Sequence, residues 1–143
     1  MTGTERMMTA IMRGLAACGC VKVRTHNVSR VHASHIIADV WQFKGMILGS
    51  PTYNTRLFPP MEYLVQMLEN KAMKNRCLGV FGSYTWSGGA VKRLRQFAQN
   101  GTWQLIEPVV EAKCAPTEAD LAACFQLGEN MAKTVLAGGS QAG

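Results

Sequence analysis

The sequence contains 143 residues, of which 48% are hydrophobic, and its formal net charge at pH 7 is +6. A chain of this length and apolar content can bury one core, so we expect residues 1–143 to form a single domain with a flexible tail at 138–143. No segment reaches the ~18–20 consecutive apolar residues of a membrane span, and charged Glu5 and Arg6 interrupt the region where a secretory signal is apolar. We therefore expect a cytoplasmic protein.

The cysteines, histidines and basic residues favour no metal site and no nucleic-acid or membrane partner. The cysteines are odd in number, scattered and without a CxxC pair, which favours reduced thiols. His32 and His35 have no accompanying carboxylate cluster and are expected to be exposed. The positive charge alone does not choose a partner, and its only local cluster, Lys92, Arg93 and Arg95, is typical of a solvated helix face.

The first third of the chain predicts a helix, an edge strand and a short helix. Over residues 4–17 apolar side chains recur every three or four positions, and Gly19 ends the pattern. Apolar and polar residues alternate over 21–24, as in a strand near a sheet edge, and a short helix is expected at 32–43.

The remaining chain predicts strands that alternate with helices. The apolar runs 45–49 and 77–82 read as strands buried on both faces, each followed by a polar loop and then a helix. A last strand at 103–113 is interrupted at Pro108 and leads to a helix that Thr117 and Asp120 open as a capping box. This alternation predicts an α/β fold with a parallel sheet, whose ligands bind at the carboxyl ends of the strands.

Three polar segments are the candidate ligand site. Thr2, Gly3 and Thr4 stand at the mouth of the first helix, where backbone N–H groups favour an anion, although an ordinary helix cap would look the same. The other two segments offer hydroxyls, amides, aromatic rings and glycines, as a flat ring system requires, and Tyr53 and Trp86 could alternatively pack on helices. Their residues are Ser50, Pro51, Thr52, Tyr53, Asn54 and Thr55 in one, and Ser83, Tyr84, Thr85, Trp86, Ser87, Gly88 and Gly89 in the other.

The stretches TERM, GSPTYN followed by LFPP, FGSYTWSGGAVK and APTEADL occur in an order and spacing that resemble a known family. From residue 2 to about 136 the chain is similar to the flavodoxin domain at the carboxyl end of flavodiiron proteins, or A-type flavoproteins. The resemblance implies a flavodoxin-like three-layer sandwich of strand order 2-1-3-4-5, bound FMN, and electron transfer to a diiron centre that reduces dioxygen or nitric oxide.

The resemblance also assigns roles to the three segments. It implies that Thr2, Gly3 and Thr4 hold the FMN phosphate. One side of the isoalloxazine would be lined by Pro51, Thr52, Tyr53 and Asn54, and the other by Ser83, Tyr84, Trp86, Ser87 and Gly88.

Two departures from the family bear on these expectations. The chain begins inside the phosphate loop, so we expect strand 1 to be missing and the chain to be a fragment, a shortened gene model or a protein whose gap another chain fills. The metallo-β-lactamase-like half with the iron ligands is also absent from this sequence, so no diiron chemistry is expected within it.

The expected function is therefore that of a redox carrier or a component of an oxidoreductase, with no catalytic side chain of its own. Its expected partner is a redox protein, either rubredoxin-like or a diiron domain, and it could form a homo-oligomer. Two alternatives remain open from the sequence: an FMN-dependent NAD(P)H:quinone reductase, and a truncated module without cofactor.

Overall fold

The structure is a computed structural model that describes residues 3–19, 45–53, 56–57, 59–70, 76–84, 89–101 and 103–137. The predicted strand at 21–24, the predicted helix at 32–43 and the predicted tail at 138–143 lie outside these residues. The described elements, in chain order, are α1 (Gly3–Ala17), β1 (Gly45–Tyr53), β2 (Arg56–Leu57), α3 (Pro59–Glu69), β3 (Cys77–Tyr84), α4 (Ala90–Asn100), β4 (Gln104–Leu105), β5 (Val110–Lys113) and α5 (Glu118–Ala137).

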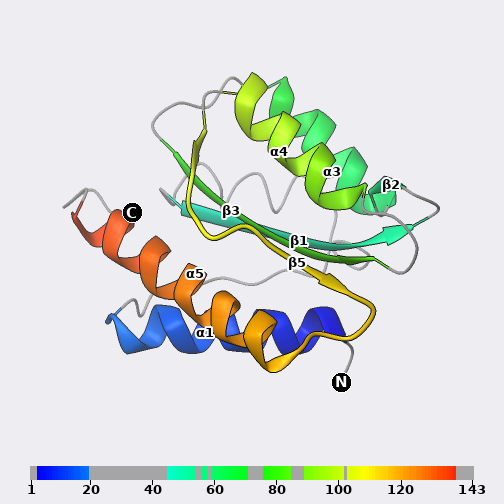
Figure 1. The fold of residues 1–143 in the computed structure, drawn as a ribbon. Coiled ribbons are helices and arrows are strands. Elements are labelled where there is room, and N and C mark those ends of the chain that lie inside the picture. Colours follow the sequence, from blue (N-terminus) through cyan, green and yellow to red (C-terminus); the bar gives the residue numbers. More distant parts are fainter. Residues whose placement is uncertain are drawn as a thin grey trace.

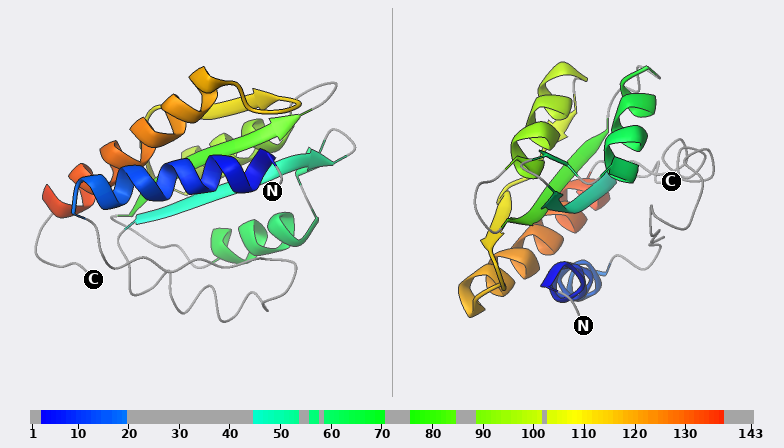
Figure 2. Two further views of the ribbon diagram at one scale, coloured as in Figure 1. Left: turned by 90° about the horizontal axis from the view of Figure 1, so that it is seen from below. Right: turned by 90° about the vertical axis from the view of Figure 1, so that its right-hand side faces the viewer.

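These elements form three layers around one sheet (Figure 1). Helices α3 and α4 cover one face, and α1 and α5 cover the other. In the right-hand view of Figure 2, α1 is seen nearly end-on, across the sheet from α3 and α4. The predicted α/β sandwich is confirmed by this arrangement.

The sheet is parallel except at one hairpin. Strands β1 and β3 pair in parallel from Gly45 opposite Cys77 to Pro51 opposite Ser83. The order is β2-β1-β3-β4, and β5 also pairs with β3. In the expected order, β1 takes the place of strand 3 and β3 takes the place of strand 4. Strands β4 and β5 together take the place of strand 5. Among the described residues, no strand precedes α1.

The two long strands extend further than the sequence predicts. Strand β1 was expected to end at 49, but it continues to Tyr53 and turns back into β2, with Thr52 opposite Leu57. Strand β3 was expected to end at 82, but it continues to Tyr84, which lies opposite Lys113 of β5. Polar residues and proline read locally as a loop, and pairing with neighbouring strands overrides that preference.

The predicted interruption of the last strand at Pro108 is confirmed. Strands β4 and β5 both pair with β3 and are separated by residues 106–109. Within this break, the backbone N–H of Ile106 still donates to the carbonyl of Leu78 at 2.8 Å. The side-chain amide of Asn130 donates to the carbonyl of Glu107 at 2.9 Å, so α5 satisfies an acceptor that the strand has lost.

Local sequence signals set the C-terminal end of α1 and the N-terminal end of α5. Gly19 follows α1 with φ +86°, a left-handed conformation that favours glycine and ends the helix as predicted. At α5, the backbone N–H of Asp120 donates to Thr117 Oγ1 at 3.1 Å, and the N–H of Thr117 donates to Asp120 Oδ2 at 2.9 Å. The predicted capping box is therefore confirmed.

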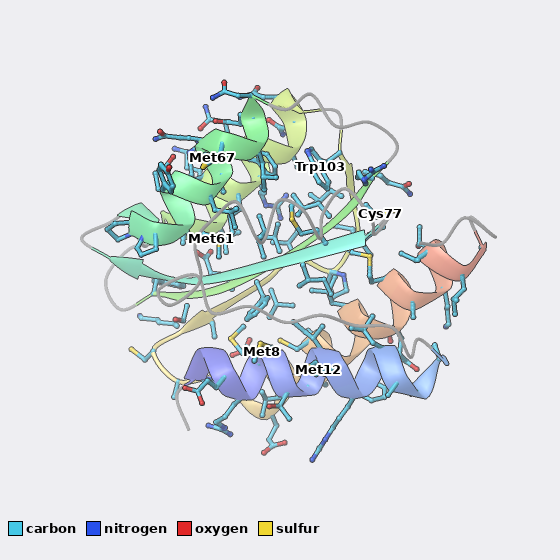
Figure 3. The ribbon with its side chains drawn as sticks, turned by 180° about the vertical axis from the view of Figure 1, so that it is seen from behind. Met8, Met12, Met61, Met67, Cys77 and Trp103 are labelled. Carbon is cyan, nitrogen blue, oxygen red and sulfur yellow. The ribbon has the colours of Figure 1, made fainter. Side chains whose placement is uncertain are left out.

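A separate apolar core fills each side of the sheet. The core under α3 and α4 includes Phe97 and Trp103, whose ring centroids are 5.4 Å apart. Figure 3 shows Met61 and Trp103 on this side and Met8 and Met12 on α1 at the other side. Helices α1 and α5, together with Phe81 of β3, form the second core. The two cores fix both helix layers on the sheet.

None of the helices in the described residues is long and apolar enough to cross a membrane. The four cysteines within the described ranges are free thiols: Cys18, Cys77, Cys114 and Cys124.

Candidate functional site

Two of the three predicted segments meet at the carboxyl edge of the sheet. Ser50, Pro51, Thr52 and Tyr53 are the last residues of β1, and Ser83 and Tyr84 are the last residues of β3. The strands are parallel neighbours with Pro51 opposite Ser83, so both polar ends leave the sheet at the same edge. This is where open parallel sheets bind their ligands.

The start of α1 lies at this edge as well. A Cβ on Gly3 would come within 3.0 Å of Pro116 Cδ, so the first turn of α1 lies directly against the connection between β5 and α5. In that connection, the N–H of Cys114 donates to the carbonyl of Tyr84 at 2.6 Å. In Figure 1, the first turn of α1 and the arrowhead of β5 lie at the same end of the sheet. Gly3, from the third predicted segment, therefore shares the edge with the other two segments.

The structure places the predicted site residues to different extents. Gly3, Ser83, Tyr84 and Gly89 are described completely, and Ser83 and Tyr84 are half-buried. Only the backbone is described for Thr4, Ser50, Pro51, Thr52 and Tyr53. The remaining predicted residues lie outside the described ranges: Thr2, Asn54, Thr55, Thr85, Trp86, Ser87 and Gly88.

Gly89 is the residue before α4 and has φ −137°, which does not require glycine. Its carbonyl accepts the backbone N–H of Arg93 at 3.0 Å, the first hydrogen bond of the helix. The predicted close approach of a ligand to Gly89 stays a prediction.

Sequence reasoning missed a contact beneath the β1 segment. Gly49 lies opposite Phe81, and a Cβ on Gly49 would overlap the Phe81 ring. The ring is 4% exposed and belongs to the α1–α5 core. A buried ring therefore supports the strand one residue before Ser50. The signal is a glycine and an aromatic residue at facing positions, which becomes visible only when the register is known.

Lys113 and Cys114 at the end of β5 were also missed. Lys113 is exposed and lies opposite Tyr84, which brings a positive charge to the carboxyl edge. Cys114 is exposed, with φ +61°. The sequence places both at the end of a predicted strand, which is the signal that could have identified them.

A parallel sheet between two helix layers, with polar segments gathered at its carboxyl edge, defines a flavodoxin-like α/β protein. The sequence model of the family described as Flavodoxin matches residues 1–128, and the chain belongs to this family. The cofactor of the flavodoxin family is FMN.

The relatives include flavodiiron proteins, which confirms the resemblance noted from the sequence. The anaerobic nitric oxide reductase flavorubredoxin of Escherichia coli (strain SMS-3-5 / SECEC) is 33% identical over 135 residues, which are 93% of this chain and 28% of that protein. The rubredoxin oxygen:oxidoreductase of Desulfovibrio gigas matches with a TM-score of 0.86 at 26% identity, over 92% of this chain and 33% of that one. The flavodiiron core Flv1 of Synechocystis sp. PCC6803 matches with a TM-score of 0.83 at 29% identity, over 92% of this chain and 32% of that one.

The chain thus spans about a third or less of the length of these relatives, as their covered shares of 28%, 33% and 32% show. It corresponds to their flavodoxin-like region.

Proposed function

We propose that this chain binds FMN noncovalently at the carboxyl edge of its sheet and passes electrons through it. The observation that carries the proposal is the convergence of three segments that are distant in sequence. Pro51 lies opposite Ser83, Tyr84 accepts a hydrogen bond from Cys114, and Gly3 lies against Pro116. The start of α1 offers an anion site, and the ends of β1 and β3 offer a polar edge.

The proposed phosphate site consists of Thr2, Gly3 and Thr4. The first N–H groups of α1 lack partners within the helix, and the helix dipole adds partial positive charge at this end. Both features favour a phosphate. The position of Gly3 suits glycine, because a Cβ there would lie 3.0 Å from Pro116 Cδ and one of the two would have to shift by a few tenths of an ångström.

The proposed ring site lies between the ends of β1 and β3 and the residues that follow them. Pro51, Thr52, Tyr53 and Asn54, with Ser50 and Thr55 beside them, would line one side of the isoalloxazine. The other side would be lined by Ser83, Tyr84, Thr85, Trp86, Ser87, Gly88 and Gly89. Tyr84 is half-buried at the end of its strand, so it can stack on a ring without first being ordered.

When bound, FMN supplies the redox chemistry. The chain's own residues bind the cofactor, orient its ring and set the electrostatics around it. The net charge of +6 favours an anionic flavin and an acidic partner. We propose a rubredoxin-like protein or a diiron domain as that partner, because the similar proteins bear the names flavorubredoxin, rubredoxin oxygen:oxidoreductase and flavodiiron core. We further propose that residues 1–143 form one domain.

The proposal is tested by titrating the purified chain with FMN and following flavin fluorescence and thermal stability. We expect saturable quenching with a dissociation constant of about 1 μM or tighter, and a rise in Tm at saturation, because a ligand that binds only the folded state stabilises it. Riboflavin, which lacks the phosphate, should bind at least about tenfold more weakly, since it leaves the helix start unused.

A pair of tyrosine variants locates the binding site. Y84A removes the tyrosine at the end of β3 and should weaken FMN binding by about tenfold, through lost stacking and burial. Y63A removes a tyrosine on α3 that is 53% exposed and should leave the affinity unchanged. Absence of both quenching and a Tm shift would refute the electron-carrier proposal and favour a module without cofactor. Consumption of NAD(P)H by the FMN-loaded chain would favour the quinone reductase instead.

A further inference from the structure

The two helices on one face of the sheet begin where the ring segments end. Helix α3 begins at Pro59, shortly after the β1–β2 hairpin, and α4 begins at Ala90, directly after Gly89. The strand ends of these connections are fixed by the pairing of β1 with β3. At their other ends, α3 and α4 are held on the sheet by the apolar core and to each other by an ion-pair network.

One ion-pair network joins these two helices. Arg93 of α4 donates from Nε to both carboxylate oxygens of Glu62, at 3.1 Å each, and from Nη2 to Glu62 Oε2 at 2.9 Å. Its Nη1 and Nη2 donate to Glu69 at 3.1 and 3.0 Å. All three guanidinium nitrogens therefore bind carboxylates of α3. Glu62 lies in the first turn of α3 and Glu69 is its last residue, so one side chain of α4 holds both ends of α3.

The network is stronger than an ordinary surface pair. The Arg93 side chain is 21% exposed, and those of Glu62 and Glu69 are 30% and 28% exposed. Isolated surface pairs contribute little, whereas bidentate arginine–carboxylate pairs and multi-charge networks are the exception. A further hydrogen bond, from Gln66 Nε2 to Glu62 Oε2 at 3.1 Å, orients the central carboxylate.

The protonation equilibria agree with this geometry. Hydrogen bonds with Glu69 and Glu62 raise the pKa of Arg93 despite its partial burial, so the guanidinium stays charged. Burial alone would raise the pKa of Glu62, but hydrogen bonds from Arg93 and Gln66 and the charge of Arg93 outweigh it, so the pKa is lowered. Arg93 and Glu62 are therefore held in the charged forms that bind each other.

Apolar packing between these helices cannot replace the network. Val65 and Leu68 of α3 and Leu94 and Phe97 of α4 share one core over the sheet. Hydrophobic contacts are non-directional, so they tolerate small shifts of a helix along its axis. Bidentate hydrogen bonds do not tolerate such shifts, because their strength falls steeply with angle and distance.

We infer that Arg93, held between Glu62 and Glu69, is a positioning residue for the flavin ring, because it fixes the start of α4, and with it Gly89 of the proposed ring site, relative to α3. The inference rests on the proposed FMN site. Arg93 does not need to touch the cofactor, and it acts through the position of Gly89, whose carbonyl accepts the backbone N–H of Arg93 at 3.0 Å.

The test compares R93Q with R95Q in the full chain. Arg95 is exposed on the same helix, so R95Q removes the same charge without removing the network. R93Q should weaken FMN binding by about tenfold and alter the visible circular dichroism and the residual fluorescence of FMN at saturation. R95Q should match the wild type in all three measurements. R93K keeps the positive charge but loses the planar, forked guanidinium, so its FMN affinity should lie between those of R93Q and the wild type.

A purely structural role predicts a different pattern. If R93Q lowers Tm but binds FMN with the affinity and spectrum of R95Q, the positioning role is refuted. If R93Q does not fold, E62Q retains the Arg93–Glu69 pair and is measured in its place, with about threefold weaker binding expected and wild-type binding counting against the inference. If the wild type itself binds no FMN, the proposed function fails, and the inference fails with it.

Discussion

Two cysteines illustrate how position determines the reactivity of a side chain. Cys124 of α5 is 0% exposed, and burial, together with the negative charge of Asp120, raises its pKa to about 12. Cys114 is exposed at the carboxyl edge of the sheet. The nucleophile in thiol chemistry is the thiolate. Burial suppresses its reaction in two ways, because it raises the pKa of the thiol and blocks the access of the reagent. The two thiols should therefore behave differently toward the same reagent.

We predict that Cys114 reacts with Ellman's reagent in the folded protein and Cys124 does not. With a pKa near 12, the Cys124 thiolate is only about one part in ten thousand at pH 8. C114A should lower the number of rapidly reacting thiols by one, and C124A should leave that number unchanged. The opposite pattern would show that α5 opens on the timescale of labelling or that Cys114 is protected.

At the scale of elements, α1 and α5 cross with their backbones in close contact. A Cβ on Gly14 would overlap the carbonyl oxygen of Phe125, and a Cβ on Gly128 would overlap the carbonyl oxygen of Ile11. The two glycines thus allow the backbones of the helices to touch. Since these helices form most of the second core, their separation sets how deeply Met7 and Leu127 are buried.

We predict that G14A and G128A each lower the free energy of unfolding by about 2–4 kcal/mol, although alanine is favoured over glycine in a helix by about 1 kcal/mol. The obstacles are backbone atoms of the facing helix, which cannot move alone. G79A is the comparator. The three atoms nearest to its new methyl are all side-chain atoms: Ile47 Cγ1 at 3.2 Å, Leu127 Cδ1 at 3.3 Å and Met131 Cε at 3.4 Å.

These flexible neighbours can shift, so G79A should cost about 1 kcal/mol or less. Urea unfolding of the three variants gives the comparison. A cost for G14A and G128A no greater than that of G79A would show that α1 and α5 separate at little expense.

Elements were predictable where the determinant is local, and less so where it is a distant partner. The cap at Thr117 and Asp120 and the strand break at Pro108 are encoded within a few residues, and the structure confirms both. The hairpin strand β2 was missed because two residues carry no periodic signal. The extension of β1 to Tyr53 was missed because distant partners determine it: β3 pairs with the strand as far as Pro51, and β2 pairs with Thr52 and Tyr53.

For the candidate site, too, some features were predictable from the sequence and those that depend on distant partners were not. The convergence of the three segments was predictable, since strand ends in a parallel sheet share an edge. The supporting contacts were not, because Gly49 meets Phe81 and Glu62 meets Arg93 only after folding brings distant parts of the chain together. From sequence alone, Arg93 belonged to an apparently solvated basic cluster. In the structure, Arg93 binds Glu62 and Glu69, whereas its neighbours Lys92 and Arg95 are exposed.

At the scale of the whole molecule, this separation determines where the positive charge is available. The net charge is +6, but Arg93 is neutralised by two glutamates. Lys92 and Arg95 remain exposed on α4, and Lys113 is exposed at the carboxyl edge. A negatively charged partner would therefore meet positive charge both beside the proposed flavin site and on the adjacent helix. Charge of this kind acts on association rate more than on affinity.

We predict that electron transfer between the FMN-loaded chain and an acidic rubredoxin slows by about tenfold between low salt and about 0.5 M NaCl, because salt screens the attraction between exposed charges. Stopped-flow absorbance of the rubredoxin measures the rate. Substituting Lys92 and Arg95 together by glutamine should lower the rate at low salt and flatten its salt dependence. K133Q, which removes one exposed charge on α5, is the control and should retain most of that dependence. Equal rates at both salt concentrations would show that these charges do not steer the partner, and would move the docking surface away from α4 and the carboxyl edge.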